Sequence, residues 1–181
     1  MYLLKGDNIR RDIIYLAHPR TASVATILTM GELGTVYQIG KTHDFDASQV
    51  PKDAIIFTTV RNPWDLFVSW WFKRSIRKSP FYGQDLAEFI PQLVKCNPQY
   101  FKRNKLFYMA KEAHRILNYE QLQAQFDLLL VEVGYAPTNL VVANQSERRK
   151  TRDYRKYYNA QTQEWVAEYF GPEIDKYMYQ F

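Results

Sequence analysis

The chain has little of what a disulfide scaffold, a zinc domain or a membrane protein requires. Among its 181 residues there is one cysteine, Cys96, so no internal disulfide and no CxxC metal knuckle can form. The longest uninterrupted aliphatic run, residues 128–131, is far shorter than the roughly 20 apolar residues that span a bilayer. Charges within residues 5–12 break the apolar core that a signal peptide needs. These absences predict a cytoplasmic chain without disulfides and without membrane contact.

The composition is that of an ordinary globular protein. Hydrophobic residues make up 46% of the chain and charged residues 24%, which excludes a disordered tail protein. The length suits one domain over residues 1–181, with residues 144–181 expected to form a basic lid and a closing helix. A net charge of +5 suits an anionic ligand, namely a nucleotide, a sulfated or phosphorylated sugar, or RNA.

Short apolar segments alternate with turn residues along the chain. The expected strands lie at 12–17, 35–39, 54–60 and 115–118, and the expected helices at 24–33, from 64 onward, at 85–95, at 120–133 and at 162–170. Strand, turn and helix in this order indicate an α/β fold with a mostly parallel central sheet flanked by helices. In such a sheet, ligands bind beyond the carboxyl ends of the strands.

Two turns at strand ends carry an arginine each. Arg20 follows the first expected strand and Arg61 the third. The first turn, residues 18–23, also offers Thr21, Ser23 and the backbone N–H groups of a helix start, which together favour an anion. It can equally be an ordinary turn in which Ser23 is the N-cap and the arginine lies on the surface. The turn lacks the glycines and the Lys-Ser/Thr pair of a nucleotide-hydrolysing P-loop, which disfavours ATP or GTP hydrolysis.

The second turn opens a motif that covers residues 61–69, Arg-Asn-Pro-Trp-Asp-Leu-Phe-Val-Ser. A guanidinium leaving the strand and the hydroxyl of Ser69 on the next helix could grip one phosphate together, since arginine forks onto two oxygens. In the alternative interpretation, Arg61 pairs locally with Asp65 and Ser69 faces a neighbouring helix.

Together, these segments resemble a known family. Residues 19–23 are similar to the 5′-phosphosulfate loop of sulfotransferases, and residues 61–69 match the R-[ND]-P-x-D-x-x-x-S pattern of their 3′-phosphate motif. Residues 41–43, Lys-Thr-His, are similar to a segment of the cytosolic branch, and residues 116–122 resemble the family's strand-to-helix junction. Residues 144–146 and the closing tyrosines look like the end of carbohydrate-type members.

The resemblance implies a P-loop-like sulfotransferase architecture and a nucleotide donor. The donor is 3′-phosphoadenosine 5′-phosphosulfate, its product is 3′,5′-diphosphoadenosine, and no metal is required. Arg20 and backbone N–H groups of the first turn would hold the 5′-phosphosulfate, while Arg61 and Ser69 would hold the 3′-phosphate. The implied donor-binding residues are Arg20, Thr21, Ala22, Ser23, Val24, Arg61 and Ser69.

The implied catalytic residues are His43, Lys41 and Arg20. His43 would be the general base on a hydroxyl or amine of the acceptor, a carbohydrate or small metabolite, and Lys41 a second cation near the sulfuryl group. A histidine suits this task because its ordinary pKa of about 6.5 leaves it largely neutral at pH 7. Asp44 or Asp46 could orient this histidine or replace it as the base, and the three residues are more typical of a solvated turn than of a metal site.

Two other functions remain open from the sequence. A nucleotide-binding protein that transfers nothing is suggested by Ala22, which stands where the family has glycine, and by Val24, which replaces a hydroxyl residue. An RNA-binding protein is suggested by the basic residues at 148–156, which alternate with tyrosines. No RRM or KH signature accompanies them, so nucleic acid is disfavoured and a lid over the nucleotide is the preferred interpretation. Nothing in the sequence specifies the oligomeric state.

Overall fold

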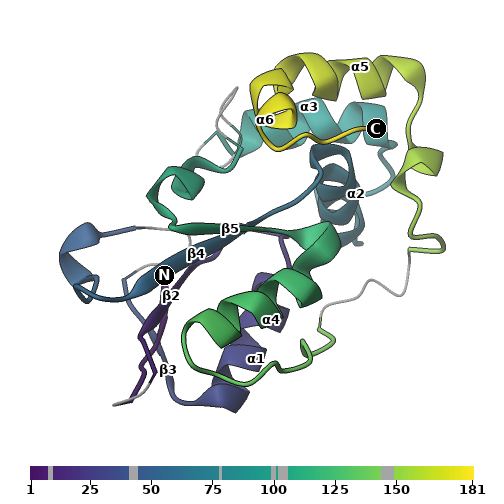
Figure 1. Ribbon diagram of the computed structural model, residues 1–181. Helices are drawn as coiled ribbons and strands as arrows, with labels where there is room; N and C mark the ends of the chain where they lie inside the picture. Colours follow the sequence, from purple (N-terminus) through teal and green to yellow (C-terminus); the bar gives the residue numbers. More distant parts are fainter. Residues whose placement is uncertain (8–9, 41–44, 78, 99–100, 102–105, 144–148) are drawn as a thin grey trace. The chain divides into compact units, whose positions relative to one another are not determined.

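The chain folds into two compact units, each built from two separate stretches. The computed structural model describes residues 1–7, 10–40, 45–77, 79–98, 101, 106–143 and 149–181 (Figure 1). The first unit comprises Met1–Arg61 and Tyr108–Gln145, and the second comprises Asn62–Phe107 and Ser146–Phe181. Among the described residues, no helix has the length and apolar character needed to cross a bilayer.

The first unit contains a five-stranded sheet. Its strands are β1 (Tyr2–Leu4), β2 (Ile13–Leu16), β3 (Val36–Gln38), β4 (Ile55–Val60) and β5 (Arg115–Asn118), in the order β3-β1-β2-β4-β5. The β2–β4 and β4–β5 pairs are parallel, whereas β1 is antiparallel to both of its neighbours, so β1 alone runs against the other described strands. This confirms the α/β class and the mostly parallel sheet, and it adds β1, which the sequence analysis missed.

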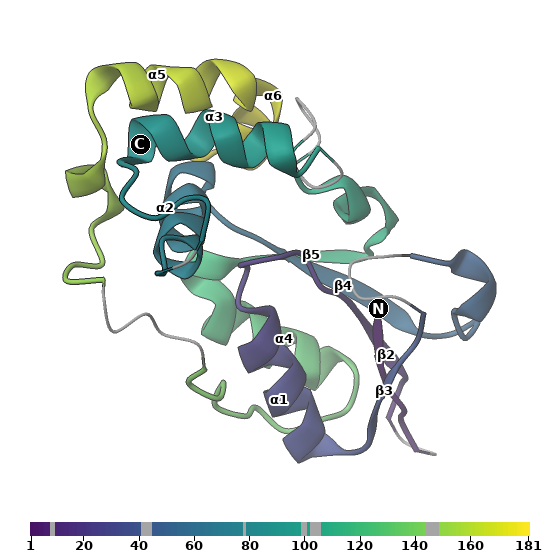
Figure 2. The same ribbon diagram turned by 180° about the vertical axis from the view of Figure 1, so that it is seen from behind.

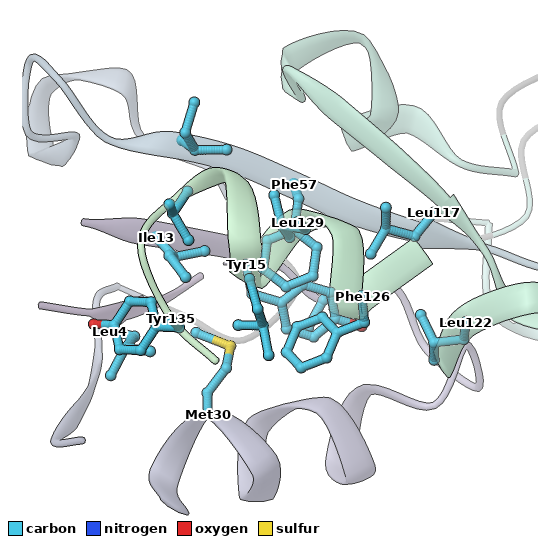
Figure 3. Packing of buried hydrophobic residues seen from close by; sticks show 14 residues of the cluster. Leu4, Ile13, Tyr15, Met30, Phe57, Leu117, Leu122, Phe126, Leu129 and Tyr135 are labelled. Atoms are coloured by element: carbon cyan, nitrogen blue, oxygen red, sulfur yellow. The ribbon is translucent and has the colours of Figure 1, made fainter. Parts of the chain in front are cut away.

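Helices α1 (Ser23–Leu33) and α4 (Leu122–Glu132) cover one face of this sheet, as the two views agree (Figures 1 and 2). Successive side chains of β2 alternate between the faces because a strand has a period of two. Tyr15 therefore joins Met30 of α1 and Phe126 of α4 in the larger core, where its ring stacks on Phe57 at 4.7 Å between centroids (Figure 3). Residues Ile14, Leu16 and Ile56 pack on the opposite face with Met109, which lies in the 3₁₀ helix η2 (Tyr108–Glu112).

The second unit is helical. It contains α2 (Pro63–Arg74), α3 (Leu86–Cys96), the 3₁₀ helix η4 (Tyr154–Tyr157), α5 (Ala160–Tyr169) and α6 (Gly171–Lys176). The centroid of the Phe67 ring on α2 lies 5.5 Å from those of both Phe101 and Phe170, so three buried aromatic rings pack together in this unit. The sequence analysis ended the last helix at Gly171-Pro172, but a further short helix starts there, because proline is well tolerated in the first turn of a helix.

Candidate anion-binding site

The first turn joins β2 to α1 in a strained conformation. The N-cap of α1 is Ala22, which has φ 63° and ψ 22° and makes no side-chain hydrogen bond to the helix start. Arg20 also has a positive φ, 66°. Left-handed backbone costs a residue with a Cβ about 1–2 kcal/mol. The interpretation of Ser23 as the N-cap is therefore wrong, since Ser23 is the first helical residue, and the cap position is held by a strained alanine.

The start of α1 leaves backbone donors available to a ligand. The N–H groups of Ser23, Val24 and Ala25 lie in the first turn and have no acceptor within the helix. Ala22 is left-handed and the helix that follows is right-handed, and such an alternation turns successive N–H groups into an anion-binding concavity. The first turn of α1 carries no acidic residue that would offset the positive end of the helix dipole.

Arg61 brings a second cation to this turn. It stands directly after β4 and is buried, and its Nη1 donates a hydrogen bond of 2.8 Å to the carbonyl oxygen of Arg20. Its guanidinium lies over the ring of Tyr119, 3.9 Å from the centroid. The two arginines that the sequence analysis located at separate strand ends therefore meet within the first unit. Tyr119 was missed as a contributor, although it falls in the junction that resembles the sulfotransferase pattern.

The electrostatics of this arrangement favour a negative ligand. Burial lowers the pKa of Arg20, and the neighbouring positive charge of Arg61 lowers it further. Two cations at close range destabilise each other unless an anion binds between or beside them. The first turn therefore combines helix N–H donors with two guanidinium groups, the donor set that phosphate and sulfate groups prefer.

A buried chain of hydroxyls lies beneath the turn. The Tyr15 hydroxyl lies 2.7 Å from Thr59 Oγ1, which in turn donates toward Thr21, 2.8 Å from its carbonyl oxygen and 2.7 Å from its Oγ1. Thr21 Oγ1 donates to the carbonyl oxygen of His18 at 2.9 Å. Burial raises the pKa of Tyr15 to about 12, so the phenol remains protonated. The sequence analysis missed Thr59; its signal is a pair of threonines in an otherwise apolar strand.

The second motif builds the start of α2 in the second unit. Asn62 Oδ1 accepts hydrogen bonds from the N–H groups of Trp64, at 3.0 Å, and Asp65, at 3.4 Å, and Pro63 occupies the first turn. The carboxylate of Asp65 forms an ion pair of 2.7 Å with Arg149. Ser69 lies on α2 and is buried. Its role toward a phosphate stays a prediction.

Known proteins resemble this chain in structure but not detectably in sequence. A scan against protein-family models and a search of curated protein sequences both find no match. The crystal structure of mouse sulfotransferase SULT7A1 complexed with PAP aligns with a TM-score of 0.51 at 15% identity, over 90% of this chain and 84% of that one. The chain has a sulfotransferase-like fold. At 15% identity this likeness shows a similar arrangement of helices and strands and does not show the chemistry of the site.

The remaining predicted residues of this sulfotransferase-like fold take different places. Lys41, His43 and Asp44 lie outside the described residues, so their roles stay predictions. Asp46 caps the 3₁₀ helix η1 (Ala47–Gln49) through its carboxylate, and the hydrogen bonds from Ser48 lower its pKa, which makes it a weaker base. In the described part of the chain, no cluster of three or more His, Cys, Asp or Glu side chains could hold a metal ion.

The basic segment after residue 148 packs on α2 within the second unit. The Tyr154 hydroxyl accepts a hydrogen bond of 3.1 Å from Asn62 Nδ2, and the Tyr158 hydroxyl donates to the carbonyl oxygen of Trp64 at 2.9 Å. The ring of Tyr157 lies 5.8 Å from that of Trp71. These tyrosines are therefore engaged in packing within the second unit, and the RNA-binding interpretation stays a prediction.

Proposed function

We propose that the chain transfers a sulfuryl group from 3′-phosphoadenosine 5′-phosphosulfate to a hydroxyl or amine of a carbohydrate or small metabolite. The observation that carries this proposal is the meeting of Arg20 and Arg61 at the uncapped start of α1. The pattern of residues 61–69 and the sulfotransferase-like fold support the choice of this donor over other doubly anionic nucleotides. The presence of PAP in the mouse sulfotransferase is consistent with a donor of this type.

The first turn supplies the electrostatic part of the proposed mechanism. Sulfuryl transfer builds negative charge on the 5′-phosphate that leaves, in close analogy to phosphoryl transfer. Arg20 and the N–H groups of residues 21–24 hold that phosphate and stabilise the developing charge, because these donors are already oriented before the reaction. Arg61 and Ser69 hold the 3′-phosphate and so fix the nucleotide in line with the acceptor.

His43 and Lys41 complete the proposed mechanism. His43 removes the proton from the acceptor hydroxyl as oxygen attacks sulfur, and Lys41 neutralises charge on the sulfuryl oxygens. The sulfur–oxygen bond to the 5′-phosphate breaks as the new one forms, so the products are the sulfated acceptor and 3′,5′-diphosphoadenosine. No metal takes part, because the cations that the reaction needs are side chains.

Two measurements on the full chain test this function. Calorimetric titration with 3′,5′-diphosphoadenosine should show binding that adenosine 5′-monophosphate, which lacks the 3′-phosphate, does not match. Transfer of label from ³⁵S-labelled donor to a panel of sugar and phenolic acceptors should follow, and His43→Ala should abolish it while leaving nucleotide affinity in place. Absence of nucleotide binding would refute the proposal.

The non-catalytic alternative rests on one observation about the first turn. Val24 exposes 43% of its surface where the family has a hydroxyl residue, so the described turn offers one donor fewer to the sulfate end. Tight binding of 3′,5′-diphosphoadenosine together with no transfer to any acceptor would favour this alternative. Transfer that is lost in the His43→Ala variant would exclude it.

A further inference from the structure

We propose that Thr59 is a positioning residue for anion binding: its buried hydroxyl holds the first turn in the strained conformation that presents the backbone N–H groups to the ligand. The identity of the ligand rests on the proposed function. The effect of Thr59 on the turn does not, because every contact that carries it lies within the first unit.

The strain in the turn needs a restraint. Arg20 and Ala22 both adopt positive φ, at 66° and 63°, within three residues. Left-handed residues other than glycine persist where the surrounding structure over-determines them, and they cluster at ligand-binding sites. The first turn would relax to an ordinary helix start without contacts that hold these dihedral angles in place.

Three consecutive carbonyl groups of the turn accept hydrogen bonds from the protein. Arg61 Nη1 donates to the carbonyl of Arg20 at 2.8 Å, Thr59 Oγ1 to that of Thr21 at 2.8 Å, and the N–H of Thr26 to that of Ala22 at 3.0 Å. In a planar trans peptide, the carbonyl and the next N–H point in opposite directions. Fixing these carbonyls therefore directs the N–H groups of residues 21–23 away from the protein donors.

Thr59 occupies the middle of this set. Its hydroxyl also reaches Thr21 Oγ1 at 2.7 Å, and it receives support from Tyr15, whose hydroxyl lies 2.7 Å away. Thr59 is fully buried on β4, so water does not replace its hydroxyl as the donor to the Thr21 carbonyl. Replacing the hydroxyl with a methyl group leaves the Thr21 carbonyl without its side-chain donor and frees the central peptide plane to rotate.

The chain contains a matched control for this residue. Thr58 is the preceding residue of β4, is equally buried, and donates its hydroxyl to the carbonyl of Leu16 at 2.6 Å. Thr58→Val and Thr59→Val each remove one buried hydroxyl from the same strand. Both should lower the melting temperature by a similar amount, whereas the hydrogen bond of Thr58 does not involve the first turn.

The experiment compares Thr59→Val, Thr59→Ser and Thr58→Val by two measurements. The first is the affinity for 3′,5′-diphosphoadenosine, which should fall about tenfold in Thr59→Val and stay within about threefold of wild type in the other two. The second is hydrogen–deuterium exchange without ligand, in which the amide of Thr26, which donates to the Ala22 carbonyl of the turn, should exchange about tenfold faster in Thr59→Val alone. Recovery in Thr59→Ser would separate the hydroxyl from the size of the side chain.

The outcomes decide between this inference and the proposed function. If wild type fails to bind 3′,5′-diphosphoadenosine, the proposed function falls, and the exchange measurement still decides the role of Thr59. Equal changes in Thr59→Val and Thr58→Val on exchange would overturn the inference even if the nucleotide binds. Should Thr59→Val not fold, Tyr15→Phe removes the next hydroxyl in this hydrogen-bonded series and should accelerate exchange of the Thr26 amide by a smaller factor. No acceleration there would also overturn the inference.

Discussion

The two helix starts that follow an arginine differ in how they satisfy their backbone. At α1 the cap is Ala22, which is left-handed, contributes no side-chain hydrogen bond and is followed by no acid in the first turn. At α2 the cap is Asn62, whose Oδ1 accepts two N–H groups, and Asp65 adds a negative charge to the first turn. The start of α2 supplies its own acceptors, whereas the start of α1 leaves its donors to an external group.

This difference separates a helix start that the protein itself completes from one that it leaves open. The residues Asn62 and Asp65 serve the start of α2, since Asn62 caps the helix and Asp65 adds a carboxylate that pairs with Arg149. The first turn places two residues other than glycine at positive φ before α1, and it gives the helix start no side-chain cap. Of the two turns, the first is thus the one whose geometry favours an anion.

The largest expected effect concerns Arg61, which links the two turns. Arg61→Ala removes a charge-assisted contact to the anion and the bond to the Arg20 carbonyl, and should weaken binding of 3′,5′-diphosphoadenosine at least about a hundredfold. Arg61→Lys keeps the charge without the fork and should give an intermediate loss. Titration calorimetry measures both. Arg11→Ala, which removes an exposed arginine at the other end of β2, serves as the control; equal losses in Arg61→Ala and Arg11→Ala would mean that net charge alone attracts the nucleotide.

The second largest effect is expected at the start of α2, which Asn62 caps. Asn62→Ala removes the cap of α2 together with the bonds from Asn62 Nδ2 to Tyr154 and to the Gln180 carbonyl, so the free energy of unfolding should fall by about 2 kcal/mol. Ser23→Ala, at the open start of α1, removes no cap bond and should change it by less than about 0.5 kcal/mol. Urea denaturation measures both, and similar losses in the two variants would contradict the comparison.

A smaller effect of opposite sign is expected at the strained cap. Ala22→Gly relieves the cost of a left-handed alanine and adds chain entropy to the unfolded state, so stability should rise by about 0.5–1 kcal/mol. Ala25→Gly, inside α1, should instead lower stability by about 1 kcal/mol. Thermal and urea denaturation distinguish the two signs. A loss of stability in Ala22→Gly would mean that the turn is not strained at this residue.

The smallest effect extends the comparison to the first turn of α6. The Glu173 carboxyl accepts the N–H of Leu106 at 2.8 Å, and burial raises its pKa above the ordinary value of 4.5. The folded chain therefore binds the proton of the Glu173 carboxyl more tightly than the unfolded chain does. Ionisation of this carboxyl lowers the free energy of unfolding as the pH rises above 4.5. Glu173→Gln cannot ionise and should become more stable relative to wild type as the pH rises from 4 to 8. A difference in unfolding free energy that is constant over this range would contradict the raised pKa.

The secondary structure is largely predictable because its signals are local. The strand expected at 115–118 has those bounds in β5, and the helix expected at 24–33 begins one residue earlier as α1. The strand β1 was missed because three residues carry too little pattern, and their place is set by pairing with β2 and β3. The helix α6 was missed because Gly-Pro after a helix indicates an end as readily as a new start.

The candidate site likewise contains residues that local sequence patterns predict and residues that only long-range contacts determine. Arg20 and Arg61 were located because strand ends in a parallel sheet face one edge, a rule that needs only the order of elements. Thr59 and Tyr119 act through contacts with residues 38 and 58 positions away in the chain, and no local pattern specifies such pairs. Ala22 has a positive φ at the position where the resemblance places glycine.

The division of the chain into interleaved stretches limits how it can be shortened. A fragment that stops at residue 145 would retain all of the first unit but only the 62–107 half of the second. Phe67 would then lose its contact with Phe170, and the aromatic surface of α2 would be left uncovered in water. A single cut therefore cannot release the first unit without part of the second, and insolubility of such a fragment would reflect the interleaved chain order of the two units.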